Sequence, residues 1–354
     1  MKILILGGTG AMGRPLVKLL NKKKKSDIFV TSRSVHKDYD NVHFIQGNAQ
    51  DDVTFVKSIL LKNHYDVLID FMVYESKILA QRLNLYLEHT DQYIFFSSSR
   101  VYASSRSPLI ESSPRLLDVC QDQEYLSTDE YALAKAREED LLIQNKKKNW
   151  TIIRPYITYN SNRLQLGVYE KENWLYRALK GKPVVFPKDI ANKYTNLTFG
   201  PDVARNLVNL IGNEAAYGEI FHIVNNESIK WRDVAEVYDK VINQVTGKHL
   251  NIKYVDNSQG LQTVWNTWQI KYDRLFDRRF NSGKIITLTG MSSYVPVEEG
   301  LTKCLTNFLA DPQWLTYRMN WGYEGWSDKQ THSLTNIFEI NGKRNKLRYL
   351  KHRF

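Results

Sequence analysis

Lys2-Ile3-Leu4-Ile5-Leu6-Gly7-Gly8-Thr9-Gly10-Ala11-Met12-Gly13 is a short apolar run followed at once by closely spaced glycines. The apolar run predicts a buried strand, and the stretch from Met12 to about Leu20 has a helical pattern. Between a strand and a helix, Gly7 allows a tight turn, Gly10 lets the backbone approach a pyrophosphate, and Gly13 lets the helix pack closely. The helix N-terminus then presents unpaired N–H groups to an anion. We therefore expect a dinucleotide-binding turn formed by Gly7, Gly10, Ala11, Met12 and Gly13.

Strand and helix patterns alternate through the first half of the chain. The expected strands are Ile3–Leu6, Ile28–Thr31, Val42–Ile45, Val67–Phe71, Tyr93–Phe96 and Trp150–Arg154. The expected helices are Met12–Leu20, Val53–Leu61, Ser76–Leu87 and Asp129–Asn145. Such alternation predicts an α/β fold in which a doubly wound parallel sheet carries helices on both faces.

The pattern loosens after Tyr156. Helices are expected at Asn173–Leu179, Val203–Ile211 and Val234–Val245, and a strand at Ile220–Val224. We expect a dinucleotide-binding domain over residues 1–158 that also receives parts of 190–225. Residues 159–189 and 226–354 are expected to form a smaller, mixed substrate-binding region. Its C-terminal part is rich in Trp and Tyr, which is typical of packing or of an interface.

The formal net charge of +11 raises the question of nucleic-acid binding. Lys22–Lys25 and Lys146–Lys148 each follow a predicted helix, where cations interact favourably with the helix dipole. Lys343–Phe354 is predicted to be a solvated basic tail, with contact to an anionic surface or a neighbouring subunit as the alternative. Because the charge is explained locally, a nucleic-acid partner is not the expected one.

Cysteine content and hydropathy exclude other classes. Cys120 and Cys304 have no partner spacing, so neither a disulfide nor a metal site is expected. No apolar run approaches the ~20 residues that span a bilayer. The N-terminal apolar stretch is too short for a signal peptide. We therefore expect a cytoplasmic protein without a transmembrane segment.

The second predicted strand ends in Val30-Thr31-Ser32-Arg33. It lacks the acidic residue that accepts a hydrogen bond from the ribose 2′-OH of NAD. Ser32 and Arg33 can instead hold a 2′-phosphate, with Arg33 supplying charge-assisted donors. This pattern favours NADP over NAD. The alternative is that Arg33 is a surface charge and the cofactor is NAD.

Two Tyr–Lys pairs occur at spacing i, i+4: Tyr131 with Lys135, and Tyr176 with Lys180. On a helix this spacing places both side chains on one face. An ammonium group near a phenol lowers the phenol pKa from its ordinary value of roughly 10. Such a tyrosine can act as a general acid or base. Spacing alone does not choose between the two pairs.

Together these features resemble the extended short-chain dehydrogenase/reductase superfamily, which has a Rossmann fold, and in particular its NAD-dependent epimerase/dehydratase branch, which acts on nucleotide sugars. The matching segments are Gly7–Gly13, Gly47–Asp51, Ser97–Tyr102, Tyr131–Lys135, Arg154-Pro155 and Thr198–Ala204. Their order and spacing carry the resemblance, which covers about residues 1–245. The final hundred residues match no segment of the family.

The resemblance implies roles for individual residues. The catalytic helix of the family lies between the serine-containing strand and the Arg-Pro strand, which selects Tyr131 rather than Tyr176. Tyr131 would transfer protons, while Lys135 would tune it and bind the nicotinamide ribose. Ser98 would stabilise charge on the reacting sugar oxygen, with Ser97 and Ser99 as alternatives. Asn48 and Asp51 would contact the adenine, although Asn48 departs from the acidic residue common there.

The resemblance also limits the reaction. Ser99 and Arg100 stand where dehydratases of the family have acidic residues, which disfavours 4,6-dehydration. Arg100 is either a ligand for a substrate carboxylate or phosphate, or part of an outward salt bridge. Further weak substrate candidates are Ser99, Asn160, Arg163 and Lys188.

We therefore expect an NAD(P)-dependent epimerase or reductase, an isomerase or oxidoreductase, that acts on a nucleotide-linked sugar. A homodimer is possible. The alternative is a non-catalytic dinucleotide-binding sensor or scaffold, or an RNA-binding protein of the same fold.

Overall fold

The N-terminal apolar run forms strand β1 (Lys2–Leu6), in which Ile3 through Leu6 are fully buried. The computed structural model describes residues 1–354. In it β1 lies inside a seven-stranded parallel sheet of order β13-β6-β5-β4-β1-β2-β3. The other strands are β2 (Asp27–Ser32), β3 (Val42–Gln46), β4 (Tyr65–Asp70), β5 (Thr90–Phe96), β6 (Trp150–Pro155) and β13 (Glu219–Ile223). The predicted doubly wound α/β fold is confirmed.

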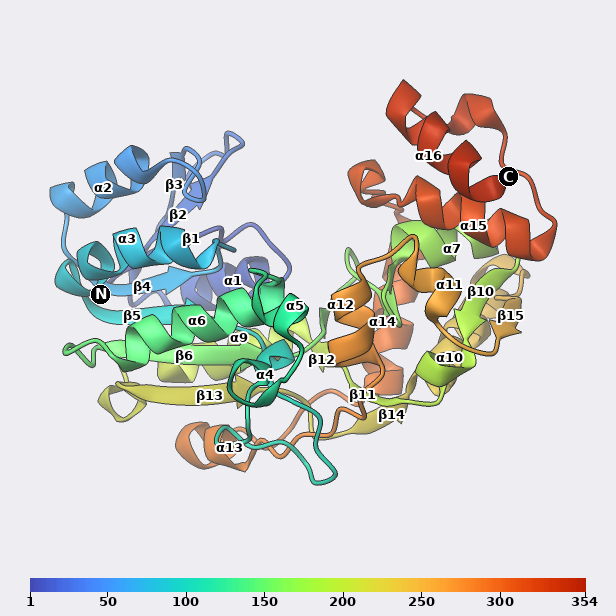
Figure 1. The fold of residues 1–354 in the computed structure, drawn as a ribbon. Coiled ribbons are helices and arrows are strands. Elements are labelled where there is room, and N and C mark those ends of the chain that lie inside the picture. Colours follow the sequence, from blue (N-terminus) through green and yellow to red (C-terminus); the bar gives the residue numbers. More distant parts are fainter.

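Helices cover both faces of this sheet (Figure 1). Alternate residues of β1 point to opposite faces, so Ile3 and Ile5 join one core while Leu4 and Leu6 join the other. The first core is closed by α1 (Gly13–Lys23), α9 (Gly200–Leu210) and α13 (Gly283–Thr289). The second is closed by α2 (Val53–Lys62), α3 (Ser76–Glu88) and α6 (Tyr131–Ile143).

The order of the strands reverses beside β1. From β1 the chain adds β2 and β3 on one side, then crosses to β4 and continues through β5 and β6 on the other. At such a switch point the connections leave the strand ends in opposite directions and open a crevice at their carboxyl ends. The fold therefore places the glycine turn and the segments after β2, β3 and β4 around one crevice.

A second lobe has its own hydrophobic core, which includes Trp174, Phe186, Tyr238, Leu305 and Tyr323. Its helices are α7 (Lys171–Leu179), α8 (Lys188–Ala191), α10 (Trp231–Thr246), α11 (Gln259–Gln262), α14 (Val297–Ala310) and α15 (Trp321–Thr331). Its main strand pair is β10 (Val184–Pro187) with β15 (Ile252–Val255). Figure 1 shows this lobe beside the sheet lobe, with the C-terminus on it.

Shorter elements complete the fold. The strand pairs are β7 (Thr158–Tyr159) with β12 (Thr198–Phe199), β8 (Gln165–Leu166) with β9 (Tyr169–Glu170), and β11 (Tyr194–Asn196) with β14 (Ser228–Lys230). The short helices are α4 (Leu116–Val119), α5 (Gln123–Leu126) and α12 (Thr267–Gln269). Every strand and helix expected in residues 1–245 is present, with ends that differ by a few residues.

The prediction of a solvated tail at the C-terminus is wrong. These residues form helix α16 (Lys343–Arg353), which packs on α15. Tyr349 is buried there, and its hydroxyl donates to the Asp328 carboxylate at 2.9 Å. At Gly325 a Cβ would lie 2.2 Å from the Tyr349 carbonyl oxygen, so only glycine allows this close approach. One tyrosine on the inner face of the helix holds the basic segment in place.

Candidate dinucleotide site

The glycine turn is tight at Gly7, open at Gly10 and closely packed at Gly13. Gly7 adopts a φ of +76°. At Gly13 a Cβ would lie 2.4 Å from the Gly8 carbonyl oxygen, so the start of α1 packs on the turn only as glycine. At Gly10 a Cβ would meet nothing nearer than the Gly7 carbonyl oxygen at 3.7 Å and would occupy open space above the turn. No side chain caps the N-terminus of α1, although the Arg14 N–H already donates to the Gly10 carbonyl at 3.1 Å.

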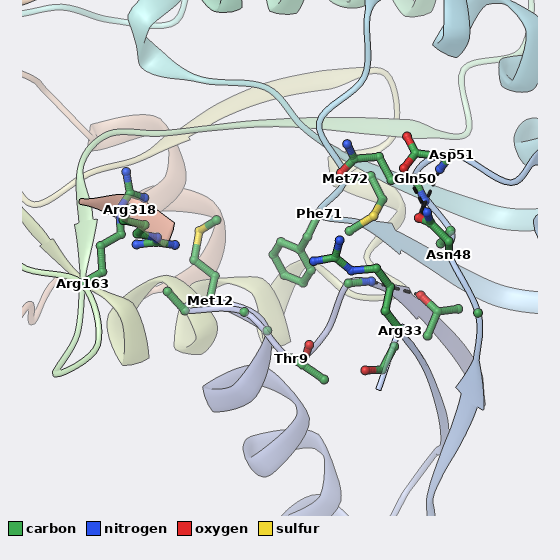
Figure 2. Close-up of a pocket in the computed structure, with 18 residues that line it drawn as sticks. Thr9, Met12, Arg33, Asn48, Gln50, Asp51, Phe71, Met72, Arg163 and Arg318 are labelled. Atoms are coloured by element: carbon green, nitrogen blue, oxygen red, sulfur yellow. Dashed lines mark hydrogen bonds between the residues drawn. The ribbon is translucent and has the colours of Figure 1, made fainter. Parts of the chain in front are cut away.

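A cavity of about 360 Å³ lies over this turn. Its walls come from the carboxyl ends of β1, β2, β3 and β4 and from the second lobe. Figure 2 shows Arg163 and Arg318 together at one end of the cavity and Asn48 and Asp51 at the other. The predicted cofactor residues that line it are Gly7, Gly10, Ala11, Met12, Gly13, Ser32, Arg33, Asn48 and Asp51. Lys135 is the one predicted cofactor residue that does not.

The end of β2 carries the residues on which the choice of cofactor depends. Ser32 accepts a hydrogen bond from the Ser34 N–H at 3.2 Å, and its hydroxyl lies 3.1 Å from His36 Nε2. Arg33 is exposed, and Figure 2 shows its side chain extending across the cavity toward Phe71. Opposite, Asp51 accepts from the Asn48 amide at 2.9 Å. The cation at this end of the cavity is therefore Arg33.

Tyr131 is the first residue of α6 and is half-buried. The Arg100 guanidinium lies 5.3 Å from the centre of its ring. Lys135 is fully buried one turn later, with its Nζ 2.9 Å from the Glu138 carboxylate and 4.7 Å from the Phe95 ring centre. The Lys135 ammonium makes no hydrogen bond to a protein group. It therefore still has N–H groups to donate, although an ion pair holds it.

Two buried carboxylates face Lys135. Burial raises the pKa of Glu138 to about 7, against the opposing effect of the Lys135 charge. Burial also raises the pKa of Asp70, while the Met72 N–H at 2.9 Å and the Tyr93 hydroxyl at 2.9 Å act against that rise. Glu138 lies three residues after Lys135, so the i, i+3 spacing was a signal that the sequence analysis missed.

The three serines after β5 are distinguished by their hydrogen bonds. Ser97 donates to Glu139 at 2.5 Å, and Ser99 donates to the Arg154 carbonyl at 2.9 Å. Ser98 instead accepts from the Arg100 N–H at 3.2 Å and keeps its own hydroxyl hydrogen free of these partners. Of the three, Ser98 is therefore the one available to a ligand.

Arg100 does not form an outward salt bridge, which was one of the two predicted alternatives. Its side chain is buried and pairs with Glu130 at 2.7 Å and with Asp273 at 3.7 Å. Asp273 belongs to the second lobe, so Arg100 joins the two lobes beside Tyr131. Its charge is balanced by these carboxylates.

The second lobe closes one end of the cavity. Asn160 donates to the Ala11 carbonyl at 3.3 Å, which ties the β7–β8 turn to the glycine turn. Arg163 and Arg318 lie 3.4 and 3.7 Å from the same carboxylate, Glu170. Lys188, in contrast, pairs with Asp256 at 2.7 Å and does not line the cavity.

Eight residues that line the cavity were not among the predicted site residues: Thr9, Thr31, Gly47, Ala49, Gln50, Phe71, Met72 and Arg318. Phe71 and Met72 directly follow β4, and their position at the carboxyl end of a predicted strand could have identified them. Arg318 lies in the segment after residue 311, where no motif distinguishes it from other surface arginines.

Residues 3–223 match the model of the NAD dependent epimerase/dehydratase family. This match covers more than half of the chain, and the chain belongs to that family. None of its helices combines the length and the apolar character that crossing a bilayer would need.

The chain is also similar to the chloroplast stem-loop binding protein of 41 kDa b of Arabidopsis thaliana, with 29% identity over 255 residues. That similarity spans 68% of this chain but only 62% of the plant protein.

Solved structures share the fold at low identity. The UDP-glucuronic acid 4-epimerase of Bacillus cereus, in complex with UDP-glucuronic acid and NAD, is 16% identical with a TM-score of 0.66, over 88% of this chain and 100% of that one. The dTDP-glucose 4,6-dehydratase of Bacillus anthracis str. Ames, in complex with NAD, is 16% identical with a TM-score of 0.66. That similarity covers 90% of this chain and 100% of the dehydratase chain. These similarities show the fold alone.

Proposed function

We propose that this protein is an NAD(P)-dependent epimerase or reductase that acts on a nucleotide-linked sugar, with Tyr131 as its proton-transfer group. The observation that carries the proposal is the common location of two features. The glycine-turn cavity lies at the carboxyl ends of β1 to β4, and Ser98 follows the carboxyl end of the adjacent β5, next to the Arg100 that contacts the Tyr131 ring.

The cavity fits a dinucleotide. The open space above Gly10 and the uncapped N-terminus of α1 suit a pyrophosphate. Arg33 at the end of β2 supports NADP over NAD, whereas the two similar structures are complexes with NAD. Asn48 and Asp51 would hold the adenine. When bound, the nicotinamide would give or accept a hydride at a sugar carbon.

In the proposed chemistry, Tyr131 exchanges a proton with a sugar hydroxyl or keto oxygen. The free Ser98 hydroxyl donates to the same oxygen and stabilises the charge that develops there. Lys135 supplies a positive charge beside the phenolate and N–H donors for the nicotinamide ribose, while Glu138 holds its ammonium in place.

We further propose that residues 159–189 and 226–354 bind the nucleotide part of the substrate. Arg163 and Arg318, which both pair with Glu170, are suited to a diphosphate. Asn160, which is tied to Ala11, would place the substrate against the glycine turn. A homodimer remains a prediction.

Epimerase and reductase differ in what happens to the cofactor. An epimerase returns the hydride to the same sugar and retains its cofactor, whereas a reductase exchanges NADPH for NADP. The test is to denature the purified protein and to assay the nucleotide that it releases. Stoichiometric NAD would contradict the reductase, and an empty site that binds NADPH would contradict the epimerase.

RNA binding is a second candidate, because the plant relative is named as a stem-loop binding protein and this chain has a net charge of +11. Association with a labelled RNA hairpin should then weaken steeply with salt. The candidate also requires that no sugar nucleotide is turned over, because turnover would identify the Tyr131 site as catalytic.

A further inference from the structure

The second Tyr–Lys pair lies in the second lobe on α7, where it anchors the C-terminal extension, residues 311–354. The Tyr176 hydroxyl donates to Glu339 at 3.0 Å, and Lys180 forms an ion pair with the same carboxylate. The Lys180 ammonium also lies 4.8 Å from the centre of the Tyr176 ring. Burial raises the pKa of Tyr176 to about 12, which makes it a poor proton-transfer group.

Beside this anchor lies a cavity of about 460 Å³, separate from the glycine turn. We call it the aromatic cavity; its walls are Glu172, Tyr176, Trp314, Thr316, Tyr317, Met319, Trp321, Glu339, Asn341 and Asn345. Four of these residues are aromatic and two are carboxylates, while none is Lys, Arg or His. In a chain with a net charge of +11, a cavity without a basic wall residue is distinctive.

One carboxylate oxygen in the wall, Oε2 of Glu172, has no hydrogen-bond donor. Glu172 is 2% exposed, and its Oε1 accepts from the Leu315 N–H at 3.1 Å and pairs with Lys171. Its Oε2 is buried and has no hydrogen-bond partner. A buried carboxylate oxygen without a donor is costly, so a ligand that brings an N–H group would gain a favourable contact.

We propose that the aromatic cavity binds the ammonium or guanidinium group of a small organic cation. The faces of aromatic rings attract cations, and the attraction grows when water is excluded. The free Oε2 of Glu172 would accept a charge-assisted N–H bond. Lys171 and Lys180 pair with the two wall carboxylates from outside the lining, and Lys180 also lies against the Tyr176 ring. The rings of Trp314, Tyr317 and Trp321 and the free oxygen would therefore provide the selectivity. The site is independent of the function proposed for Tyr131.

The test is calorimetric titration of the full-length protein with N-acetylarginine amide and N-acetyllysine amide. N-acetylcitrulline amide is the matched control, because its urea group keeps the shape and most N–H donors of the guanidinium without the charge. At least one cation should bind, and the neutral analogue should bind at least about tenfold more weakly. Equal binding of the citrulline compound, or binding of neither cation, would overturn the proposal.

Two substitutions locate the binding. Tyr317 is 77% exposed at the rim, so Tyr317→Ala should leave the fold intact and weaken cation binding by about fivefold. Glu172→Gln should weaken it by about tenfold. Phe338 is an 84% exposed aromatic residue of the same extension that does not line the cavity. Phe338→Ala is therefore the control that should leave binding unchanged, and an equal loss in Tyr317→Ala and Phe338→Ala would contradict the site.

Discussion

The two Tyr–Lys pairs have the same spacing on two helices of one protein, yet their surroundings are opposite. Lys135 is buried against Glu138, and Tyr131 begins α6 with the Arg100 guanidinium 5.3 Å from its ring centre. Lys180 is partly exposed, and the Tyr176 hydroxyl donates a hydrogen bond to Glu339. Spacing thus supplies only a shared helix face, and it is the surroundings that lead us to propose proton transfer for one pair and anchoring of a segment for the other.

The largest expected difference between the two pairs is in turnover after each phenolic hydroxyl is removed. Tyr131→Phe should lower turnover of a sugar nucleotide by about 10²–10⁴-fold, because general acid–base catalysis contributes that much. Tyr176→Phe should change turnover by less than about twofold, since an exposed anchoring contact contributes little. Steady-state kinetics decide the matter, with dinucleotide binding as the control for folding. Similar losses in both variants would remove the distinction.

The two lysines should differ in their effect on stability. Lys135→Met leaves Asp70 and Glu138 without their buried cation, so the free energy of unfolding at pH 8 should fall by about 3 kcal/mol. Lys180→Met removes a partly exposed partner of Glu339 and should cost less than about 1 kcal/mol. Urea denaturation of the two variants measures both values. Similar losses of unfolding free energy in the two variants would mean that burial does not make Lys135 more important for stability than Lys180.

Proton binding at Glu138 should make the free energy of unfolding depend on pH. The pKa of this carboxyl is raised to about 7, so the folded protein holds its proton more tightly than the unfolded chain. Its contribution to stability is complete below a pH of about 4.5 and is lost as the pH rises through about 7. Glu138→Gln should remove this part of the slope, on the order of 2 kcal/mol, in denaturation curves between pH 5 and 8. An unchanged slope would show that Glu138 is ionised throughout.

The smallest expected effect concerns the end of the cavity farthest from Arg318. Arg33→Ala should weaken NADP binding by about tenfold while leaving NAD binding nearly unchanged, since only NADP offers a phosphate there. Arg318→Ala, at the other end of the cavity, is the matched variant, and it should leave the ratio of the two dinucleotide affinities unchanged. Fluorescence titration with each cofactor provides the measurement. A preference for NAD in the unaltered protein would contradict the role of Arg33.

The sequence predicts local features well because their causes are local. Gly13 must be glycine because it packs on the Gly8 carbonyl, only five residues earlier in the chain. The choice of Tyr131 over Tyr176 rests on the order of the segments along the chain. Arg318 was missed because its importance comes from Glu170, far away in the chain. The packing of α16 was missed for the same reason, since Tyr349 finds its partner Asp328 on another helix.

Glu138 is an intermediate case. Its distance from Lys135 in the sequence is short, but its meaning depends on complete burial, which the polar composition of α6 conceals. Arg100 could not be settled from the sequence, because one of its two carboxylate partners, Asp273, comes from the other lobe.

The wall formed by Arg163 and Arg318 has a kinetic consequence. These side chains belong to the second lobe, whereas the glycine turn belongs to the sheet. We expect a dinucleotide bound in the cavity to contact both lobes, so that opening of the contact between Asn160 and Ala11 would limit how fast it leaves. Residence time would then depend on a segment outside the dinucleotide-binding fold, and two proteins with identical glycine turns could retain a cofactor for very different periods.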